Sequence, residues 1–281
     1  MNEQLKISYL GPQGTYSDEM AHRFASYLDG GNSTVFEPRH SFTGIFESVE
    51  AGSYGVIALE NSLEGPVTAA LDDFVLHPDV EIVAESVLDI HHCLMMRQDA
   101  DPDTVKTITS HPQGLAQCRS FVKENFPQCN LIASASTAQS ASMAAGDPAV
   151  AAIASPRAAE IYGLDIHMQN VADSPSDQTS FVLIAKKHRA RIVNNPPTKT
   201  SLLLMMKENR AGVLLMVLEE LAYANLNLTR IQSRPTKKAL GEYLFFLDVD
   251  GTVDNPDLRT ALDCLRLKLR EVRVLGCYPI I

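Results

Sequence analysis

The first 190 residues alternate between short apolar stretches and segments with helical periodicity, and this alternation restricts the possible fold more than any other feature. Apolar stretches typical of strands occupy residues 6–10, 55–59 and 105–109, and each is followed by polar residues and then by a helical pattern. Two further strands are expected over residues 149–154 and 178–185. Strands and helices that alternate in this way predict an α/β fold with a mostly parallel sheet.

Polar side chains gather at the points where predicted strands end and predicted helices begin. They are Thr15, Tyr16, Ser17, Asn61, Ser62, Ser110, His111, Gln113, Ser136, Thr137 and Ser155. Loops that follow parallel strands meet at the carboxyl edge of a sheet, where open α/β folds bind ligands, so we expect a ligand site there. The free N–H groups of the first helical turns add donors to the same edge.

Local signals predict how several helices begin and end. Ser17 is expected to cap the helix after the first strand, and Ser136 the helix of residues 137–145. Ser155 is followed by a proline and Gly163 comes seven residues later, which predicts a helix between them.

The pattern breaks between residues 186 and 200, where a basic run is followed by two asparagines and two prolines. Because the prolines continue neither a helix nor a strand, we predict a linker over residues 191–199. The linker separates a domain of residues 1–190 from a second domain of residues 200–281. Strand and helix signals in the second domain follow the order βαββαβ, the ferredoxin-like arrangement of α+β folds.

Charge is spread unevenly along the chain. Residues 1–195 carry a formal charge of −12 and residues 196–281 a charge of +2, which together make the total of −10. The acidic larger domain argues against nucleic acid as a partner, and a bound anion has to be held by backbone N–H groups and hydroxyls.

The sequence also argues against a membrane or metal protein. No apolar run is long enough to span a bilayer, and the first residues lack the pattern of a secretory signal. The five cysteines lack zinc spacings, so we expect a cytoplasmic protein with reduced thiols.

Individual motifs leave alternatives open. The GPQGTYS turn suits an anion cradle or a tight turn with a helix cap, and it lacks the P-loop spacing. A lone histidine at a loop, such as His111, is more often a structural hydrogen-bonding residue than a titrating one. His91 and His92 are expected within a strand, so their rings point to opposite faces and no metal site is expected. Thr179 is either a hydrogen-bond donor to a reacting hydroxyl or a β-branched residue suited to a strand.

The ordered set of motifs resembles prephenate dehydratase. GPQGTYS, IALENSLEGPV, IHHCLM, SHPQGLAQC, SASTAQSA and AAIASPRAAEIYGL are similar to its catalytic domain. RAGVLLMVLEELAYANLNLTRIQSRP, GEYLFFLDVDG and VRVLGCYP are similar to the ACT regulatory domain that follows it. The resemblance implies two α/β subdomains around a cleft, similar to periplasmic binding proteins, followed by a ferredoxin-like ACT domain.

The resemblance implies a lyase of phenylalanine biosynthesis, in which prephenate loses CO2 and its ring hydroxyl to become phenylpyruvate. Aromatisation drives this reaction, so no cofactor is expected. The catalytic residues implied are Thr179, Asn61 and Gln117, with Thr179 as a positioned hydrogen-bond donor. Substrate contacts are implied for Thr15, Tyr16, Ser17, Ser62, Ser110, His111, Gln113, Thr137 and Phe181.

One position departs from the family pattern. Ser180 stands where the family's Thr-Arg-Phe motif has arginine, and a hydroxyl does not replace the charge of a guanidinium. If that arginine binds substrate in the family, this chain should bind prephenate weakly or accept another compound. If the arginine is structural, a nearby arginine can substitute for it, and Arg157 at a predicted helix start in the same domain is the candidate.

The second domain resembles a phenylalanine sensor. Its effector residues, matched to the family's GAL and ESRP motifs, are Gly212, Val213, Leu214, Gln232, Ser233 and Arg234. The likeness implies feedback inhibition by phenylalanine bound between ACT domains of different subunits, in a homodimer or homotetramer. Gln232 replaces the glutamate of the family motif, which changes a charge at this site.

Other functions stay open on the sequence. An arogenate dehydratase or a non-aromatising prephenate decarboxylase fits the same scaffold, and a non-catalytic amino-acid sensor fits the cleft and the ACT domain. The dehydratase proposal requires Thr15, Asn61, Gln117 and Thr179 to share one cavity.

Overall fold

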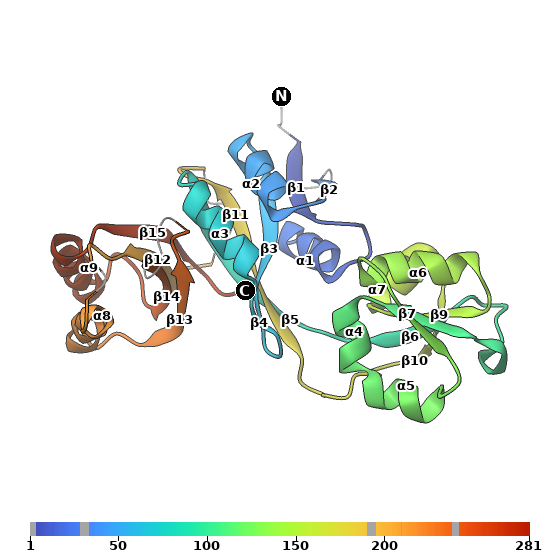
Figure 1. Ribbon diagram of the computed structural model, residues 1–281. Coiled ribbons are helices and arrows are strands. Elements are labelled where there is room, and N and C mark those ends of the chain that lie inside the picture. Colours follow the sequence, from blue (N-terminus) through green and yellow to red (C-terminus); the bar gives the residue numbers. More distant parts are fainter. Residues whose placement is uncertain (1–3, 29–33, 190–194, 209, 238–241) are drawn as a thin grey trace. The chain divides into compact units, whose positions relative to one another are not determined.

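The computed structural model describes residues 4–28, 34–189, 195–208, 210–237 and 242–281 (Figure 1). The chain forms two compact units, of which the first comprises Met1–Asp73 and Val87–Phe181 and the second Phe74–Ser86 and Val182–Ile281. The domain limits predicted from the sequence stay a prediction, because the boundaries between the two compact units lie at other residues. None of the helices in the described ranges has the length and apolar character needed to cross a membrane.

The first sheet has the strand order β2-β1-β3-β11-β5, and β4 pairs with β3. Its strands are β1 (Leu5–Leu10), β2 (Thr34–Arg39), β3 (Tyr54–Asn61), β4 (Gly65–Pro66), β5 (Val80–Asp89) and β11 (Gln178–Lys186). β1 runs parallel to both β2 and β3, as the alternating pattern predicts. The helices of this part are α1 (Tyr16–Ala25), α2 (Phe42–Glu50) and α3 (Thr68–Leu76). Alternate strand residues such as Ile7 and Tyr9 are buried with Phe24 of α1 and Phe46 of α2, so these helices cover the apolar core of the sheet.

The second sheet lies in the first unit and has the order β10-β6-β9-β7-β8. Its strands are β6 (Cys93–Met96), β7 (Thr107–Ser110), β8 (Asn130–Ala133), β9 (Val150–Ala154) and β10 (Asp165–Met168). Its helical elements are η1 (Pro102–Thr104), α4 (Pro112–Gln117), α5 (Arg119–Asn125), α6 (Thr137–Gly146) and α7 (Pro156–Tyr162). β7 is parallel to β8 and β9, whereas β6 is antiparallel to β9 and β10 to β6. Alternating residues of β9 pack on opposite faces, Ala152 against α6 and α7 and Ile153 against the side of α5.

Helix capping confirms two expectations and corrects a third. Ser136 caps α6, and Ser155 caps α7, which ends at Gly163 with φ +65. The expectation that Ser17 caps the first helix is wrong. Gly14 turns the chain with φ +89, so Thr15 takes the extended cap conformation and accepts the N–H of Asp18 at 3.3 Å. Ser17 is therefore the second residue of α1.

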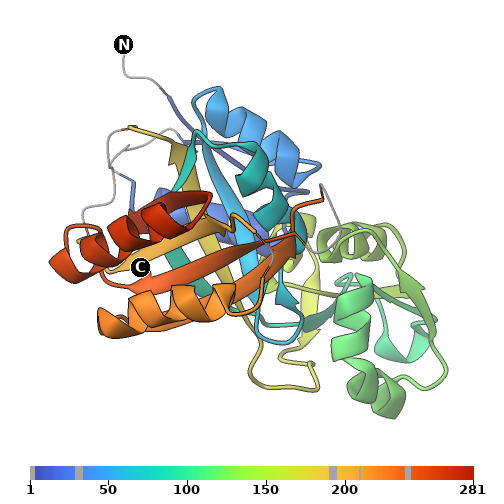
Figure 2. The same cartoon turned by 60° about the vertical axis from the view of Figure 1, so that its left-hand side comes forward.

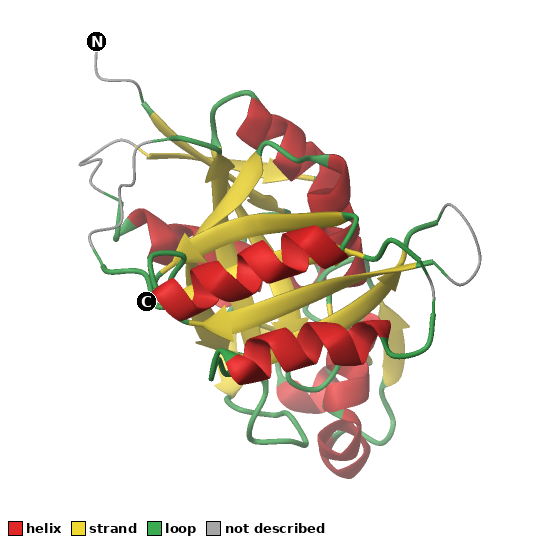
Figure 3. Cartoon of the chain, turned by 90° about the vertical axis from the view of Figure 1, so that its left-hand side faces the viewer, coloured by secondary structure: helices red, strands yellow, loops and turns green. Residues whose placement is uncertain are grey.

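The third sheet belongs to the second unit and has the order β13-β14-β12-β15. Its elements are β12 (Lys199–Met205), α8 (Val213–Tyr223), β13 (Leu228–Pro235), β14 (Tyr243–Asp250), α9 (Pro256–Lys268) and β15 (Glu271–Tyr278). They occur in the predicted order βαββαβ, and β14 pairs antiparallel with both β12 and β13, as β15 does with β12. α8 and α9 lie side by side over one face of the sheet (Figures 2 and 3). Leucines of β12 pack against them, including Leu202 and Leu204. Of the predicted linker, residues 191–194 lie outside the described residues, and Lys199 is the first residue of β12.

Charged side chains are buried on β12 and β14 in the second unit. Lys199 Nζ lies 2.7 Å from Glu85 Oε2, and both side chains are almost fully buried. Arg230 Nε lies 3.1 Å from a carboxylate oxygen of Asp248. Burial raises the pKa of Asp248, while Arg230 acts in the opposite direction. These pairs keep each buried charge next to a partner of opposite sign, which is the condition for tolerating it in a core.

Candidate active site

A cavity of about 280 Å³ lies in the first unit, and both sheets of that unit contribute to its wall. Ten of the twelve residues expected to be catalytic or to bind substrate line it: Thr15, Tyr16, Ser17, Asn61, His111, Gln113, Gln117, Thr137, Thr179 and Phe181. The four residues required to share one cavity, Thr15, Asn61, Gln117 and Thr179, are therefore together. Thr15 follows β1, Asn61 ends β3, Gln117 ends α4 after β7, and Thr179 lies at the start of β11. This is the edge expected from the parallel strands.

Asn61, at the end of β3, holds the side chains that begin β11. Its Oδ1 accepts the backbone N–H groups of Leu63 and Glu64, both at 3.0 Å, so the orientation of the amide is fixed. Its Nδ2 consequently faces β11 and donates to Asp177 Oδ1 at 2.6 Å and to Thr179 Oγ1 at 3.0 Å. Asn61, Asp177 and Thr179 are all buried.

This arrangement gives the Thr179 hydroxyl a defined role. A hydroxyl has one hydrogen and two lone pairs, and the Thr179 oxygen already accepts from Asn61. Its hydrogen is thus left to donate, and the side chain lines the cavity. The geometry favours the interpretation of Thr179 as a hydrogen-bond donor to a bound molecule.

Two long helices begin at the cavity. Thr15 caps α1 and Ser136 caps α6, and both caps line the cavity together with the first helical residues Tyr16 and Thr137. Amide groups in a first helical turn have no acceptor within their own helix and carry a partial positive charge. The Thr15 hydroxyl is used locally, because it donates to Leu10 O at 3.2 Å and Pro12 O at 3.0 Å. The N-termini of α1 and α6 therefore offer backbone donors for an anion.

A histidine just before β6 and a glutamine at the end of α4 complete the polar wall. His92 Nε2 lies 2.7 Å from Gln117 Oε1, and His92 Nδ1 lies 3.1 Å from the Tyr16 hydroxyl. Burial lowers the pKa of His92, while the contact with Gln117 opposes this shift. His92 is accordingly neutral near pH 7. The buried Gln117 Nε2 has no hydrogen-bond partner among the described residues, so it is a donor available to a ligand.

The lining of the cavity holds few charges. In the part of the chain that the structure describes, the lining residues include Asp177 but no lysine or arginine. A bound anion would therefore meet neutral N–H and O–H donors in place of a salt bridge. This agrees with the expectation drawn from the acidic charge of the first 195 residues.

Two of the expected substrate contacts lie elsewhere. Ser62 does not line the cavity, and its Oγ accepts the N–H of Gln178 at 2.9 Å, which ties the end of β3 to the start of β11. Ser110 is fully buried and donates to Ile153 O at 2.7 Å, so it joins β7 to β9. Both hydroxyls therefore join strands whose ends position the residues of the cavity.

The departure at position 180 leaves the lining of the cavity unchanged. Thr179 and Phe181 line the cavity, whereas Ser180, between them on β11, does not. Successive strand residues point to opposite faces, so a side chain at position 180 is directed away from the cavity. Arg157, the candidate substitute for the family arginine, lies outside the lining, and its Nε donates to Asp18 Oδ2 at 2.6 Å.

Two residues that line the cavity, His92 and Asp177, were not among the predicted site residues. His91 and His92 were expected in a strand, but they lie between β5 and β6, with His91 Nδ1 2.9 Å from Asn170 Oδ1. The histidine pair in IHHCLM and the aspartate directly before Thr179 were the available signals. No group of three or more His, Cys, Asp or Glu side chains suited to a metal ion is found within the described ranges.

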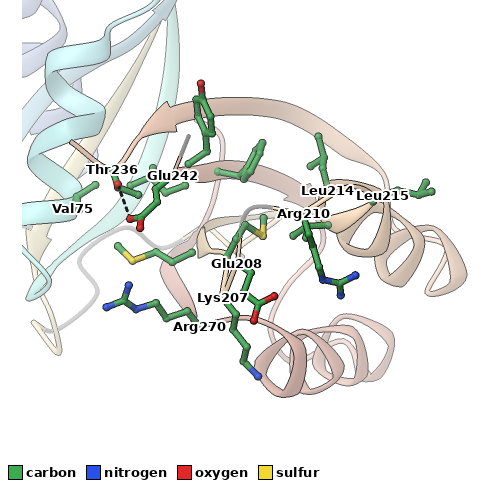
Figure 4. A pocket seen from close by; sticks show the side chains of 16 residues that line it. Val75, Lys207, Glu208, Arg210, Leu214, Leu215, Thr236, Glu242 and Arg270 are labelled. Carbon is green, nitrogen blue, oxygen red and sulfur yellow. Dashed lines mark hydrogen bonds between the residues drawn. The ribbon is translucent and has the colours of Figure 1, made fainter. Parts of the chain in front are cut away.

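The second unit contains a separate cavity of about 390 Å³ (Figure 4). Gly212, Val213 and Leu214, at the start of α8, line this cavity. Gln232, Ser233 and Arg234 do not line it; they lie on β13, an edge strand of the third sheet.

The lining of this second cavity is amphipathic. Its apolar part includes Met205, Met206 and Phe245. Arg210 and Arg270 lie on opposite sides of the cavity in Figure 4. The cavity thus combines an apolar wall with charged groups at its margins, which suits a small amphipathic molecule.

Comparisons with known proteins give one consistent family. The prephenate dehydratase family model matches residues 7–189. A prephenate dehydratase of Methanocaldococcus jannaschii is 35% identical over 274 residues, covering 98% of this chain and 98% of the relative. The crystal structure of prephenate dehydratase from Arthrobacter aurescens in complex with L-Phe has a TM-score of 0.87 and 30% identity, covering 98% of this chain and 90% of that one.

A further solved structure carries a different description. GqqA, described as a novel type of quorum quenching acylase, has a TM-score of 0.83 and 29% identity, covering 98% of each chain. The family model and the relative from M. jannaschii together decide the family, since the first matches well over half of the chain and the second almost all of it. The chain therefore belongs to the prephenate dehydratase family.

Proposed function

We propose that this protein is a prephenate dehydratase that converts prephenate into phenylpyruvate. The observation that carries the proposal is the Thr179 hydroxyl, held by Asn61 so that its hydrogen is free to donate, in a cavity where α1 and α6 begin. These features supply what the reaction needs, which is donors for two carboxylates and one donor for a departing hydroxyl.

The reaction balances without a cofactor. The ring carboxyl group leaves as CO2, its bonding electrons enter the ring, and the carbon–oxygen bond to the ring hydroxyl breaks. Prephenate with two negative charges, plus one proton, thereby gives phenylpyruvate with one negative charge, CO2 and water. Because the new ring is aromatic, the main task of the protein is to hold the dianion and stabilise the departing oxygen.

The described side chains fit these tasks. The N–H groups that begin α1 and α6 bind the carboxylates, and Gln117 Nε2 adds a neutral donor. Thr179 donates its hydrogen bond to the departing hydroxyl, which becomes more basic as the carbon–oxygen bond breaks. This donor is stronger in the transition state than in the ground state, so its effect falls on kcat.

The likeness to GqqA leaves this proposal unchanged. An acylase that uses a hydroxyl as nucleophile needs a base that accepts the hydroxyl proton. In the described residues the side chain that contacts the Thr179 hydroxyl is the Asn61 amide, which donates to it. That environment suits a donor and disfavours a nucleophile.

We further propose that the two α/β halves of the first unit form the cleft of a periplasmic-binding-protein-like catalytic domain, and that residues 200–281 form an ACT domain. The strand order β13-β14-β12-β15, with α8 and α9 on one face, supports the ferredoxin-like architecture. The Arthrobacter aurescens relative was solved in complex with L-Phe. Phenylalanine is accordingly the proposed effector of this protein.

The second cavity is the proposed effector site. Its apolar wall suits an aromatic side chain, and Gly212, Val213 and Leu214 place the start of α8 beside it. Because Gln232, Ser233 and Arg234 lie on the edge strand β13, we propose that a second copy of the chain brings this strand to the bound phenylalanine. The active form would then be a homodimer or homotetramer.

One assay tests the catalytic proposal. Prephenate and arogenate are offered separately to the purified full chain, with and without phenylalanine, while phenylpyruvate and phenylalanine are quantified. We expect phenylpyruvate from prephenate and a lower rate when phenylalanine is added. Production of phenylalanine from arogenate with no turnover of prephenate would contradict the proposal, as would binding without any product.

Calorimetry tests the effector site separately. L-Phenylalanine should bind the full chain, and Leu214→Glu, which places a charge in the apolar wall, should weaken that binding. Leu267→Glu is the matched control, because Leu267 is exposed on α9 and does not line the cavity. Equal affinity in both variants would place the effector elsewhere.

A further inference from the structure

A buried ion pair joins the two halves of the first unit. Arg157, on α7 beside the second sheet, donates from Nε to Asp18 Oδ2 at 2.6 Å, and Asp18 lies on α1 beside the first sheet. The Asp18 side chain is fully buried, and about a fifth of the Arg157 side chain is exposed. Neither residue lines the cavity.

The same ion pair holds the turn that precedes α1. Asp18 Oδ2, which Arg157 contacts, also accepts the N–H of Gly14 at 3.1 Å. Ser155, directly before α7, donates to the carbonyl of Gly14 at 3.0 Å. The N–H of Gly14 is therefore held by the Asp18 carboxylate, which Arg157 contacts, and the C=O of Gly14 is held by the Ser155 hydroxyl.

The turn has little room to adapt. Gly14 has φ +89, and a Cβ placed there would lie 3.3 Å from the ring of Tyr162 and 3.4 Å from Ala158 Cα, both on α7. Close packing against α7 and the hydrogen bonds to Asp18 and Ser155 thus specify a single path for the chain.

His22 on α1 also contacts the Arg157 guanidinium. His22 Nδ1 lies 2.9 Å from Asp18 O, and His22 Nε2 lies 3.1 Å from Arg157 Nη2. With Nδ1–H donating to the carbonyl, Nε2 is free to accept from Arg157. The His22 ring stacks on Phe36 of β2 with ring centroids 3.7 Å apart, so the first sheet also restrains the arginine.

The cavity depends on the position of this turn. Thr15 follows Gly14 directly, and Thr15, Tyr16 and Ser17 all line the cavity. A shift of Gly14 would therefore move the N–H groups at the start of α1 away from the wall that the second sheet supplies. We propose that Arg157 is a positioning residue, which sets the anion-binding end of α1 through Asp18 and the Gly14 turn.

This inference rests on the proposed function, because its readout is the turnover of prephenate. The amide groups of α1 bind a carboxylate in the ground state and in the transition state alike. Loss of such uniform binding raises KM and leaves kcat nearly unchanged. A purely structural role of Arg157 would lower Tm without affecting KM at temperatures where the variant is fully folded.

Three variants test the inference in the full chain, at a temperature where circular dichroism shows each to be folded. Arg157→Gln should raise KM for prephenate by about tenfold, the size expected when an anion loses its contact with a helix N-terminus, and should change kcat less than threefold. Arg157→Lys keeps a cation beside Asp18 and should restore KM to within about threefold of wild type. Asp18→Asn combined with Arg157→Gln removes the buried unpaired charge, so it should fold even if Arg157→Gln does not, and it should still raise KM.

Arg97→Gln is the matched control, because Arg97 forms an exposed ion pair with Asp99 and does not line the cavity. It should leave KM and kcat unchanged. A wild-type KM in the folded Arg157→Gln or double variant would overturn the inference, and so would a loss of kcat with KM unchanged. If wild type itself does not turn over prephenate, the proposed function fails, and this result is distinct from a failure of the inference.

Discussion

Thr179→Val should separate the chemistry of the site from its folding. Valine keeps the β-branched shape of threonine and removes only the hydroxyl, at a position that is 8% exposed. Asn61 Nδ2 has two hydrogens and three acceptors within reach, namely Thr179 Oγ1 at 3.0 Å, Asp177 Oδ1 at 2.6 Å and Gln178 O at 3.3 Å. After the substitution two acceptors remain, so neither hydrogen of the Asn61 amide is left without a partner.

The expected magnitudes follow from these contacts. Loss of one hydrogen bond with no orphaned partner should lower the free energy of unfolding by about 1 kcal/mol. Loss of a preorganised donor to the departing oxygen should raise the activation free energy by about 3 kcal/mol. At 1.36 kcal/mol per factor of ten, this corresponds to a fall in kcat of about 100- to 200-fold. KM should change little, because the donor acts mainly in the transition state.

The assay follows phenylpyruvate formation from prephenate, with thermal unfolding of the same samples. Thr179→Ser retains a donor, so its kcat should lie closer to wild type than to Thr179→Val. Thr200→Val is the control, because Thr200 is a buried threonine of β12 whose hydroxyl donates to Gly251 O at 2.8 Å, outside both cavities. A kcat of Thr179→Val within threefold of wild type would refute the role of this hydroxyl.

Three further predictions concern Ser180, Lys199 and His92. Ser180→Arg should leave kcat and KM within about threefold of wild type or raise activity, because position 180 faces away from the cavity that Thr179 lines; a collapse of activity would show that the site requires serine. Lys199→Met removes the cation that lies 2.7 Å from the buried Glu85 carboxylate and should lower the free energy of unfolding by about 3 kcal/mol, and adding Glu85→Gln should recover most of the loss in calorimetry; equal Tm values for wild type and Lys199→Met would contradict this. Burial lowers the pKa of His92 below its unfolded value, so unfolding takes up a proton there and stability falls as the pH drops below about 6.5. Urea denaturation at pH 7.5 and 5.5 measures the free energy of unfolding, which should fall less between these pH values in His92→Gln than in wild type. An equal fall in both proteins would count against a buried, neutral His92.

The local parts of the fold were predictable because their signals lie within a few residues of one another. Ser155, the proline after it and Gly163 specify both ends of α7. The start of α1 was misplaced by two residues, because the positive φ of Gly14 is set by packing against α7, which is more than 140 residues away in the sequence. The sequence pattern alone does not contain that contact.

The site was predictable in its residue types and less so in its geometry. Asn61 and Thr179 are 118 residues apart, and only the pairing of β3 with the start of β11 brings their side chains within 3.0 Å. Ser110 was wrongly expected at the cavity, because its hydroxyl turns inward to a carbonyl of β9. Arg157 was named only as a possible substitute for the family arginine, and its contact with Asp18 of α1 was not predictable from the sequence.

The proposed binding of substrate by helix N-termini, in place of arginine or lysine, has a consequence for product release. Prephenate has two carboxylates, and one of them is lost as CO2 in each turnover. Phenylpyruvate can therefore engage only one of the two helix ends that border the cavity, at α1 or at α6. A helix N-terminus binds a single carboxylate weakly, so phenylpyruvate should dissociate quickly and leave the cavity open to prephenate. We therefore expect phenylpyruvate to be a weak competitive inhibitor with respect to prephenate.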